Sequence, residues 1–517
     1  MIHWFGTRLA GTLLLISGVA ADAGPSDDRA GMLRALAAQA GSVLGAASSC
    51  PNISPTRIDA IIGKIASVVK SSLPNGDENT AILDLFNKSQ SEGARLVAAK
   101  QIDCAIAERR LADLELASSP APQSVAVPGP ALLAAFTEQE AAGAVRGVTS
   151  NEIRLGVVGP FSGPVKDYGP KISRGIEVAF RAANDVGGVH GRKLRLITGD
   201  DGFDPGRTAE VVKKLYEKDQ VFGFIGNSGG LNAKASFPYI FEHHILCFGE
   251  FSGSTFVRND PPDRYVFNYR ASYAEESTAM VYYLVKQRHL KPEQIAVFSL
   301  LHPEADAGFA GVEKAMRALR GGDAGYILHL RYGPATIDVD TAIAQLKAHK
   351  TPIKAVLMLA SHNAAARFVD KTHEAYPGLI YAAISLANAT ALRDDLMQLG
   401  PKYAAGILVT QTVPAAEGYS SLVLEYKAAL SAYFGGEAPD YISLEAYVSA
   451  RILIEALKRA GPQLDTERVV ETLEAMRDFD LGLGTPISFS RSDHQAVHKV
   501  WGTQLTETGT YEPIELQ

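Results

Sequence analysis

The 517-residue chain has little cysteine, little tryptophan and no marked excess of either charge. It contains 3 cysteines and 2 tryptophans, and 50 lysines and arginines against 57 aspartates and glutamates give a formal net charge of −7. Without a basic surplus, we do not expect nucleic acid as a partner. Beyond the N-terminus, no apolar run reaches the roughly 18 residues that a spanning helix needs, so stable membrane insertion is not expected. Three thiols without Cys-x-x-Cys spacing favour no structural zinc site, and no cofactor is expected.

The N-terminus has the features of an export signal. Arg8 precedes an apolar run over residues 9–20, and the small residues Ala21 and Ala23 flank Asp22 before Gly24. This pattern predicts a secretory signal peptide over residues 1–23. An uncleaved membrane anchor is the alternative, but the run is short for a spanning helix.

Export would place the cysteines in an oxidising compartment, where disulfides can form. Cys50 and Cys104 both lie in the N-terminal region, and we expect them to pair. Cys247 lies in the apolar run 245–248 and is expected to be a buried thiol.

Residues 24–117 have the pattern of a small all-α extension. Ser54-Pro55 is a typical helix start, and apolar residues then recur at helical spacing over 58–69. Further helices are expected from residue 82 and over 96–114. Residues 118–150 are expected to form a linker and a lead-in helix, since 117–130 are rich in Pro, Ser and Ala. The extension should therefore be a separate module.

After Ser150, short β-rich runs alternate with helical segments. Strands are expected over 153–158, 194–198, 221–225, 245–248, 294–299, 326–330, 355–359 and 380–384. Such alternation is typical of parallel sheets covered by helices on both faces. Because this part of the chain is longer than one sheet needs, we expect two α/β lobes.

The sequence Gly226-Asn227-Ser228-Gly229-Gly230 matches G-x-S-x-G between an expected strand and helix. In that context Ser228 could be a hydrolase nucleophile, with Asp306 and His362 as partners. A strand-to-helix turn rich in Gly and Ser also exposes backbone N–H groups that bind anions. We favour the second interpretation, because no recognisable acid and histidine pattern accompanies Ser228.

A matching loop, residues 249–254, follows the next expected strand. Neighbouring loops at the carboxyl edge of an open α/β sheet are where such sheets bind ligands. Ordinary turn chemistry is the alternative for this loop.

Asp200, Asp201 and Asp204 form an acidic cluster that ends in Asp204-Pro205-Gly206. Carboxylate oxygens could bind calcium. We favour Asp204 as the cap of a helix that begins at Pro205, and expect no metal site.

Several short motifs together resemble the branched-chain amino-acid-binding family, the periplasmic solute-binding proteins of ABC importers. The resemblance covers about residues 147–505, and residues 24–146 lie outside it. It rests on Gly147-Val148-Thr149, Ile153-Arg154-Leu155-Gly156, Ser162-Gly163-Pro164-Val165, Tyr168-Gly169, Ala183-Asn184, Gly187-Gly188, Gly191-Arg192-Lys193-Leu194, Asp200-Asp201, Asp204-Pro205, Leu444-Glu445-Ala446-Tyr447 and Arg451-Ile452-Leu453.

The resemblance implies an α/β fold of two doubly wound lobes joined by three crossover strands, the type I periplasmic binding protein fold. Lobe one would hold 151–270 and 413–483, and lobe two 271–412 and 484–517. A ligand would be trapped in the cleft between them, and no catalysis is implied.

The resemblance also implies where the ligand is held. The loops at 228–230 and 250–252 would bind its carboxylate and ammonium, and Tyr168 would pack on its side chain. In lobe two, the acidic position that pairs with the ammonium falls near Ser385, and an aromatic position falls on His362. A tyrosine position falls near Ala307, at the unusual segment 301–306. The expected ligand-binding residues are Tyr168, Ser228, Gly229, Gly230, Glu250, Phe251, Ser252, His362 and Ser385.

Ser385, His362 and Ala307 depart from the family's residues at these lobe-two positions. The departures argue against a branched-chain amino acid as the ligand, unless Glu250 replaces the missing charge from the other lobe. We expect a periplasmic protein that traps a small polar or carboxylate-bearing ligand and delivers it to the permease of an ABC importer. A ligand sensor for a membrane signalling partner is the first alternative, and a serine hydrolase built on Ser228 is the second.

Overall fold

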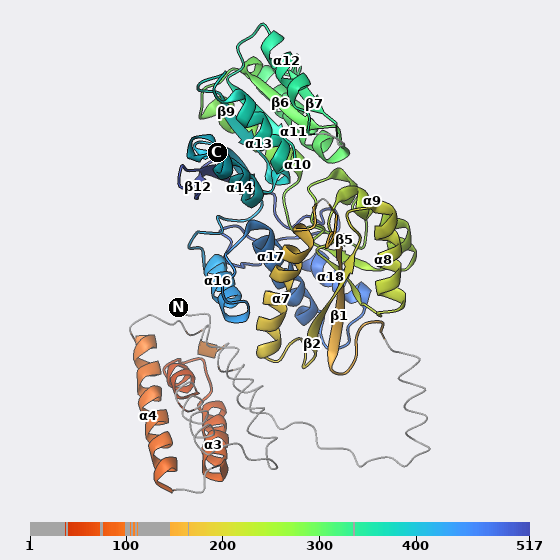
Figure 1. Cartoon of the computed structure of the whole chain (residues 1–517). Helices are drawn as coiled ribbons and strands as arrows, with labels where there is room; N and C mark the ends of the chain where they lie inside the picture. The colour runs from red at the N-terminus through yellow and green to blue at the C-terminus, as the bar shows by residue number, and fades with distance from the viewer. Residues whose placement is uncertain are drawn as a thin grey trace. The chain divides into compact units, whose positions relative to one another are not determined.

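The computed structural model describes residues 37, 40–72, 76–98, 104, 107–108, 111, 145–163, 165–333 and 337–516. The chain divides into two compact units, Met1–Glu140 and Ala141–Gln517 (Figure 1). The expected signal peptide lies outside the described residues, as does the expected linker up to residue 144.

The first unit is helical where it is described. Residues 40–48 are helical and are followed by α3 (Pro55–Ser72) and α4 (Gly76–Ala98). Helix 40–48 packs closely on α4, because a Cβ at Gly45 would lie 1.8 Å from the carbonyl oxygen of Gln90. Since α4 continues to Ala98, Leu96 and Val97 belong to it rather than to the separate helix expected over 96–114.

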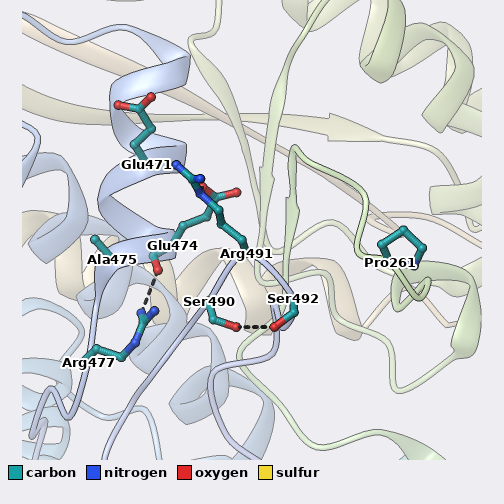
Figure 2. A pocket seen from close by; sticks show the side chains of 8 residues that line it. All are labelled: Pro261, Glu471, Glu474, Ala475, Arg477, Ser490, Arg491 and Ser492. Atoms are coloured by element: carbon teal, nitrogen blue, oxygen red, sulfur yellow. Dashed lines mark hydrogen bonds and ion pairs between the residues drawn. The ribbon is translucent and has the colours of Figure 1, made fainter.

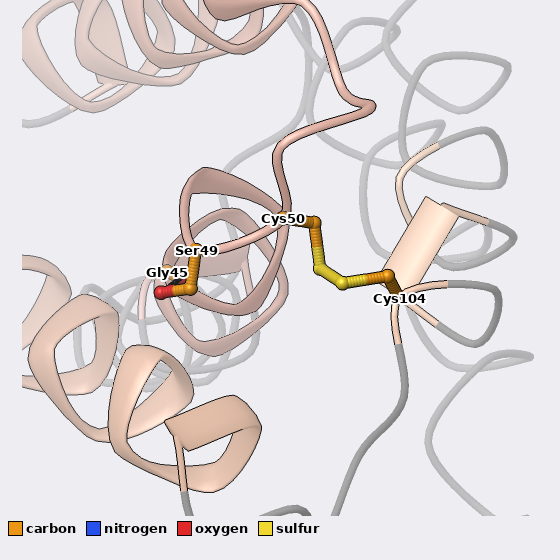
Figure 3. The surroundings of a disulfide bond; sticks show 4 residues. All are labelled: Gly45, Ser49, Cys50 and Cys104. Carbon is orange, nitrogen blue, oxygen red and sulfur yellow. Dashed lines mark hydrogen bonds between the residues drawn. A yellow bond between two sulfur atoms is a disulfide. The ribbon is translucent and has the colours of Figure 1, made fainter.

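A disulfide joins Cys50 to Cys104 in this unit (Figure 3). Cys50 follows helix 40–48 and is buried with Leu44, Ile58 and Phe86 in one apolar cluster. The bond therefore attaches the segment at Cys104 to the core of the unit. The third cysteine, Cys247, is a free and buried thiol in the second unit.

Within the described part of the second unit, the strands form two sheets. The first is a parallel 5-stranded sheet in the order β2-β1-β3-β4-β5. Its strands are β1 (Glu152–Gly159), β2 (Lys193–Asp200), β3 (Gly223–Ile225), β4 (Leu246–Phe248) and β5 (Val266–Phe267).

Helices cover both faces of this sheet. Successive strand residues point to opposite faces, and apolar side chains on both faces are buried by helices. Leu155 and Val157 of β1 share an apolar cluster with Ile176 of α7 (Tyr168–Asp185). Val158, the next residue, belongs to another cluster with Leu215 of α8 (Pro205–Glu217). Figure 1 shows α7 beside α17 (Tyr441–Arg459), with α8 and α9 (Gly230–Glu242) across the sheet. Two further helices of this part are α16 (Ser421–Tyr433) and α18 (Thr466–Ala475).

The second sheet has 7 strands in the order β12-β11-β10-β9-β8-β6-β7, among the described residues. Pairing is parallel except that β11 runs antiparallel to both of its neighbours. The strands are β6 (Ile295–Leu300), β7 (His329–Tyr332), β8 (Ala355–Leu359), β9 (Ile380–Ala383), β10 (Leu408–Gln411), β11 (Trp501–Leu505) and β12 (Tyr511–Ile514).

Helices α10 (Tyr273–Lys286) and α11 (Pro303–Arg320) cover one face of this sheet. Val297 and Leu357 share an apolar cluster with Met280 and Val312 of these helices. The other face carries α12 (Asp340–Ala348), α13 (His362–Thr372) and α14 (Ala389–Leu399), and α15 (Pro401–Ala404) follows α14. Short 3-10 turns are η1 (Thr255–Val257), η2 (Pro292–Gln294) and η3 (Ser385–Ala387).

The chain passes between the two sheets three times within the described residues, after β5, after β10 and before β11. Tyr269 links the three passages. Its carbonyl accepts a hydrogen bond from the Val497 N–H at 3.1 Å, and its hydroxyl donates to the Thr412 carbonyl at 2.9 Å. Although residues 484–517 were expected in lobe two, Phe489 and His494 pack on Phe267 of the first sheet.

The expected strands are present, with ends shifted by a few residues. The expected strand 326–330 is β7 at His329–Tyr332, and 221–225 is β3 at Gly223–Ile225. Strands β10, β11 and β12, and the short β5, were not anticipated, because their sequences lack a long apolar run. The predicted fold, doubly wound α/β lobes preceded by a small helical region, is correct.

Candidate functional site

The predicted ligand residues lie on loops at the carboxyl ends of strands of both sheets. Residues 226–229 follow β3 and residues 249–254 follow β4, while Ser385 follows β9. Tyr168 begins α7, after β1. The two loops of the first sheet are hydrogen-bonded to each other, since the Phe251 N–H donates to the Asn227 carbonyl at 2.6 Å.

The β3 loop is shaped so that the first N–H of α9 is available to an acceptor. Gly229 has φ of 94°, a conformation that glycine adopts without strain. A Cβ at Gly230 would lie 2.7 Å from the Ser254 Cβ, so a side chain there would displace the β4 loop. The Gly230 N–H donates to Oε1 of Glu304 at 2.7 Å.

Glu304 reaches this loop from the second sheet. It lies in the first turn of α11, after Pro303, and is 7% exposed. Its Oε1 also accepts a hydrogen bond from the Ser252 hydroxyl at 3.2 Å. Two of the predicted ligand residues, Gly230 and Ser252, therefore converge on one carboxylate oxygen.

Arg270 lies on the segment between β5 and α10, near Glu304 and the loops that it contacts. Its Nη2 donates to Oε1 of Glu276 at 3.1 Å and also to the Ser385 hydroxyl. Its guanidinium carbon lies 5.6 Å from the ring centroid of Phe251, within the range of a cation–π contact. A cation of the protein itself is thus adjacent to Ser385, the position expected to face a ligand ammonium.

Glu276 supplies the carboxylate that position 385 lacks. Its Oε2 accepts from the Ser385 N–H at 2.9 Å and from the Thr410 hydroxyl at 2.6 Å, and its Oε1 accepts from the Ser385 hydroxyl at 2.7 Å. With Arg270 also bound, both oxygens of this carboxylate accept hydrogen bonds from side chains or backbone of the protein.

Tyr168 and Phe251 form an aromatic wall next to Glu304. Their ring centroids are 6.4 Å apart in an edge-to-face arrangement. Burial raises the pKa of the Tyr168 hydroxyl well above its usual value, and the negative charge of Glu304 raises it further. Tyr168 therefore remains a neutral hydroxyl at physiological pH.

Glu250 is turned into the first sheet. Its Oε1 accepts from the Asn227 amide at 3.3 Å, and it lies beside the Cys247 thiol. Burial raises its pKa to about 8, and hydrogen bonds from Asn227 and Cys247 only partly oppose this. The side chain is consequently mostly protonated at neutral pH and is unsuited to balance an ammonium group.

Two further predicted residues form no hydrogen bond with Glu304 among the described residues. The buried Ser228 hydroxyl has no hydrogen-bond partner among the described residues, and no histidine is placed to activate it. Nδ1 of His362 is 2.6 Å from the Asp395 carboxylate on α14. Asp306, the other residue considered for a triad, pairs with Arg331.

The acidic cluster holds loops together. Asp204 accepts a hydrogen bond from the Arg207 N–H at 2.9 Å and caps α8, as predicted. Asp200 accepts from the Ser162 hydroxyl at 2.6 Å, which lowers the pKa of Asp200. Within the described ranges, no group of three or more His, Cys, Asp or Glu side chains is arranged to hold a metal ion.

A surface pocket of about 800 Å³ lies elsewhere, between α18 and the segment 490–492 (Figure 2). None of the predicted ligand residues lines it; its lining consists of Pro261, Glu471, Glu474, Ala475, Arg477, Ser490, Arg491 and Ser492.

Two sheets whose carboxyl edges contact each other, joined by three passages of chain, define a two-lobed binding protein. The sequence profile of the periplasmic binding protein family matches residues 152–510, and the chain belongs to this family. It is of the leucine/isoleucine/valine-binding type, whose members bind solutes and are not enzymes. Membership implies an extracytoplasmic location. In the part of the chain that is described, no helix is long and apolar enough to cross a membrane.

Individual relatives agree with this assignment. The Leu/Ile/Val-binding protein homolog 7 of Brucella melitensis is 25% identical over 375 residues, 69% of this chain and 89% of that protein. The structure of a possible leucine/isoleucine/valine-binding protein from Rhodopirellula baltica is 31% identical with a TM-score of 0.66, covering 72% of this chain and 98% of that one. The structure of a branched chain amino acid ABC transporter from Thermus thermophilus with bound valine is 19% identical with a TM-score of 0.61. It covers 71% of this chain and 96% of that one.

Three charged residues of the site were missed by sequence reasoning: Arg270, Glu276 and Glu304. For Glu304 there was a partial signal, because it lies in the unusual segment 301–306 that follows the expected strand 294–299. Nothing in the local sequence indicates that its carboxylate contacts a loop of the other sheet.

Proposed function

We propose that the protein binds a small polar or carboxylate-bearing ligand between the facing loops of its two sheets and delivers it to an ABC importer. One observation carries the proposal: the Gly230 N–H and the Ser252 hydroxyl converge on a carboxylate, that of Glu304. The N-terminal end of a helix favours negative charge, and a charge-assisted hydrogen bond is stronger than a neutral one. A ligand acid would use the same two donors.

The surroundings support a ligand of modest size. Tyr168 and Phe251 offer an aromatic surface beside the donors, and Arg270 supplies a positive charge nearby. Family membership and the relatives named for leucine, isoleucine and valine support transport of a small solute. Closure of the two lobes around the ligand would generate the form that a permease recognises.

A thermal-shift screen of the full-length chain against amino acids, amides, small carboxylates and polyols tests the binding. A specific ligand should raise the unfolding temperature by mass action, and its affinity follows from calorimetry. For a carboxylate ligand, Ser252→Ala should weaken binding roughly ten- to a hundredfold, since a hydrogen bond to a charged group is lost.

Ser254→Ala is the matched control. The Ser254 hydroxyl accepts from the Phe256 N–H within the same loop, so this variant also loses a loop hydrogen bond but keeps the Ser252 donor. Equal weakening by both variants, or no ligand in the whole screen, would contradict the proposed site. Uptake of the identified ligand should be lost from cells that lack the protein, and unchanged uptake would contradict delivery to an importer.

A further inference from the structure

We propose that the Glu304 carboxylate is an internal occupant of the anion subsite formed by the Gly230 N–H and the Ser252 hydroxyl. It holds the two lobes together without a ligand, and an incoming carboxylate must displace it. Glu304 is therefore a specificity-determining residue of the binding site. The inference rests on the proposed function, since it names the group with which the ligand competes.

The donors define a subsite for one anionic oxygen. The Gly230 N–H opens α9 and has no partner within that helix, so it needs an external acceptor. The Ser252 hydroxyl is buried at 0% exposure, and it lies close to the same oxygen. A backbone donor and a buried hydroxyl together give a rigid pair, and both currently bind Oε1 of Glu304.

The carboxylate is held in position from the second sheet. Pro303 occupies the first position of α11, and Nδ1 of His302 accepts weakly from the Glu304 N–H at 3.4 Å. Glu304 is 74 residues from Gly230 along the chain, so the contact joins elements of different sheets rather than a single loop. When the lobes separate, this contact must break.

The neighbouring groups make a second carboxylate unfavourable while Glu304 remains. The negative charge of Glu304 already raises the pKa of the hydroxyls of Tyr168 and Tyr273, although burial is the larger cause for both. A ligand carboxylate at the same donors would meet that charge directly. A neutral ligand of the same shape would not, so competition should depend on the charge of the ligand.

The distance between the lobes tests the first part of the proposal. Lys213 on α8 and Lys347 on α12 are exposed and lie on helices of different sheets. Cysteines at these two positions can carry spin labels, because Cys247 is buried and the other two cysteines are bonded. In the ligand-free, full-length protein we expect one short distance, and Glu304→Ala should move most of the population to longer distances.

Glu313→Gln is the control on the same helix, since Glu313 pairs with Arg317 and makes no contact with the first sheet that the structure records. It should leave the distance distribution unchanged. An unchanged distribution in Glu304→Ala, or an equal change in both variants, would overturn the proposal.

Acetate and acetamide, a charged and a neutral probe of the same shape, test the competition. In thermal-shift titrations of unlabelled protein, acetate should raise the unfolding temperature of Glu304→Ala at roughly tenfold lower concentration than that of the wild type. Acetamide should raise the two unfolding temperatures at the same concentration. Equal responses to acetate, including none in either protein, would overturn the competition. A failed ligand screen with a changed distance distribution would contradict the proposed function and leave the internal contact established.

Discussion

Arg270 and Glu276 form an ion pair that is almost completely removed from solvent, at the point where the chain leaves the first sheet. Nη2 of Arg270 lies 3.1 Å from Oε1 of Glu276, and the side chains are 3% and 0% exposed. Glu445 of α17 lies 3.5 Å from Nη1 of the same guanidinium. One cation therefore joins a helix of each sheet to the passage between them.

We predict that Glu276→Gln strongly destabilises the second unit. Removing one member of a buried pair typically costs about 3–5 kcal/mol, and we expect a loss toward the lower end of this range because Glu445 remains beside the Arg270 guanidinium. Urea unfolding followed by circular dichroism measures the loss. Glu374→Gln removes a carboxylate from an exposed pair with Lys402 and should leave the unfolding midpoint unchanged. A loss for Glu276→Gln no larger than that of this control would contradict the prediction.

The raised pKa of Glu250 predicts a specific pH dependence of stability. Between its ordinary value of 4.5 and about 8, the folded protein keeps the proton that the unfolded chain releases, so the free energy of unfolding falls as the pH rises. The slope from one such group is at most about 1.4 kcal/mol per pH unit.

Glu250→Gln removes this titration, so its stability relative to the wild type should increase from pH 5 to pH 8. Denaturant unfolding at several pH values measures the difference between the two proteins. A difference that stays constant over this range would show that Glu250 is ionised in the folded state.

We predict that leucine, isoleucine and valine do not bind with micromolar affinity. The ligand ammonium would find Ser385 in place of an acid, and the nearby Glu276 is already bound by Arg270, Ser385 and Thr410. Loss of a charge-assisted hydrogen bond typically costs about 1.5–3 kcal/mol, or roughly ten- to a hundredfold in affinity.

Calorimetry of the full-length protein with the three amino acids decides this prediction. Micromolar binding that is lost in Glu250→Gln would mean that Glu250 turns outward and supplies the charge. Micromolar binding that survives this substitution would show that the ammonium is held in some other way, and that our interpretation of the pocket is wrong.

The disulfide should stabilise the helical unit alone. It closes a segment with a sequence separation of 54 residues, for which the chain-entropy model gives roughly 4 kcal/mol. In Cys50→Ser/Cys104→Ser the helical unit should unfold at lower temperature, while the second unit keeps its transition. Calorimetry of the variant, compared with a chain that starts at Ala141, separates the two transitions. A lowered transition in the second unit would show that the units are not independent.

The strand-to-helix alternation of the second unit could be predicted because it depends on local chemistry. Apolar runs of strand length predicted β1, β6 and β8 closely, since a strand buried on both faces must be apolar throughout. The cap at Asp204 followed from a carboxylate placed before proline. The strands near the C-terminus lacked such runs and could not be found in this way.

The candidate site could be predicted only in part. Glycine and serine after two neighbouring strands predicted the two loops, and the family resemblance singled out Gly230 and Ser252 within them. Their hydrogen bonds depend on backbone conformation within a few residues. Burial decided the role of Glu250, because the direction of a side chain at the end of a strand depends on what packs around it. The same is true of His362, which pairs with Asp395 on the next helix.

The sequence by itself determined the family, most strands of the two sheets and the two loops of the first sheet. Only the tertiary structure decided which charges meet there. Glu304 reaches Gly230 across 74 residues of chain, and Arg270 reaches Ser385 across 115. Contacts over such separations depend on how two sheets are oriented by three passages of chain, and no local pattern of residues encodes that orientation.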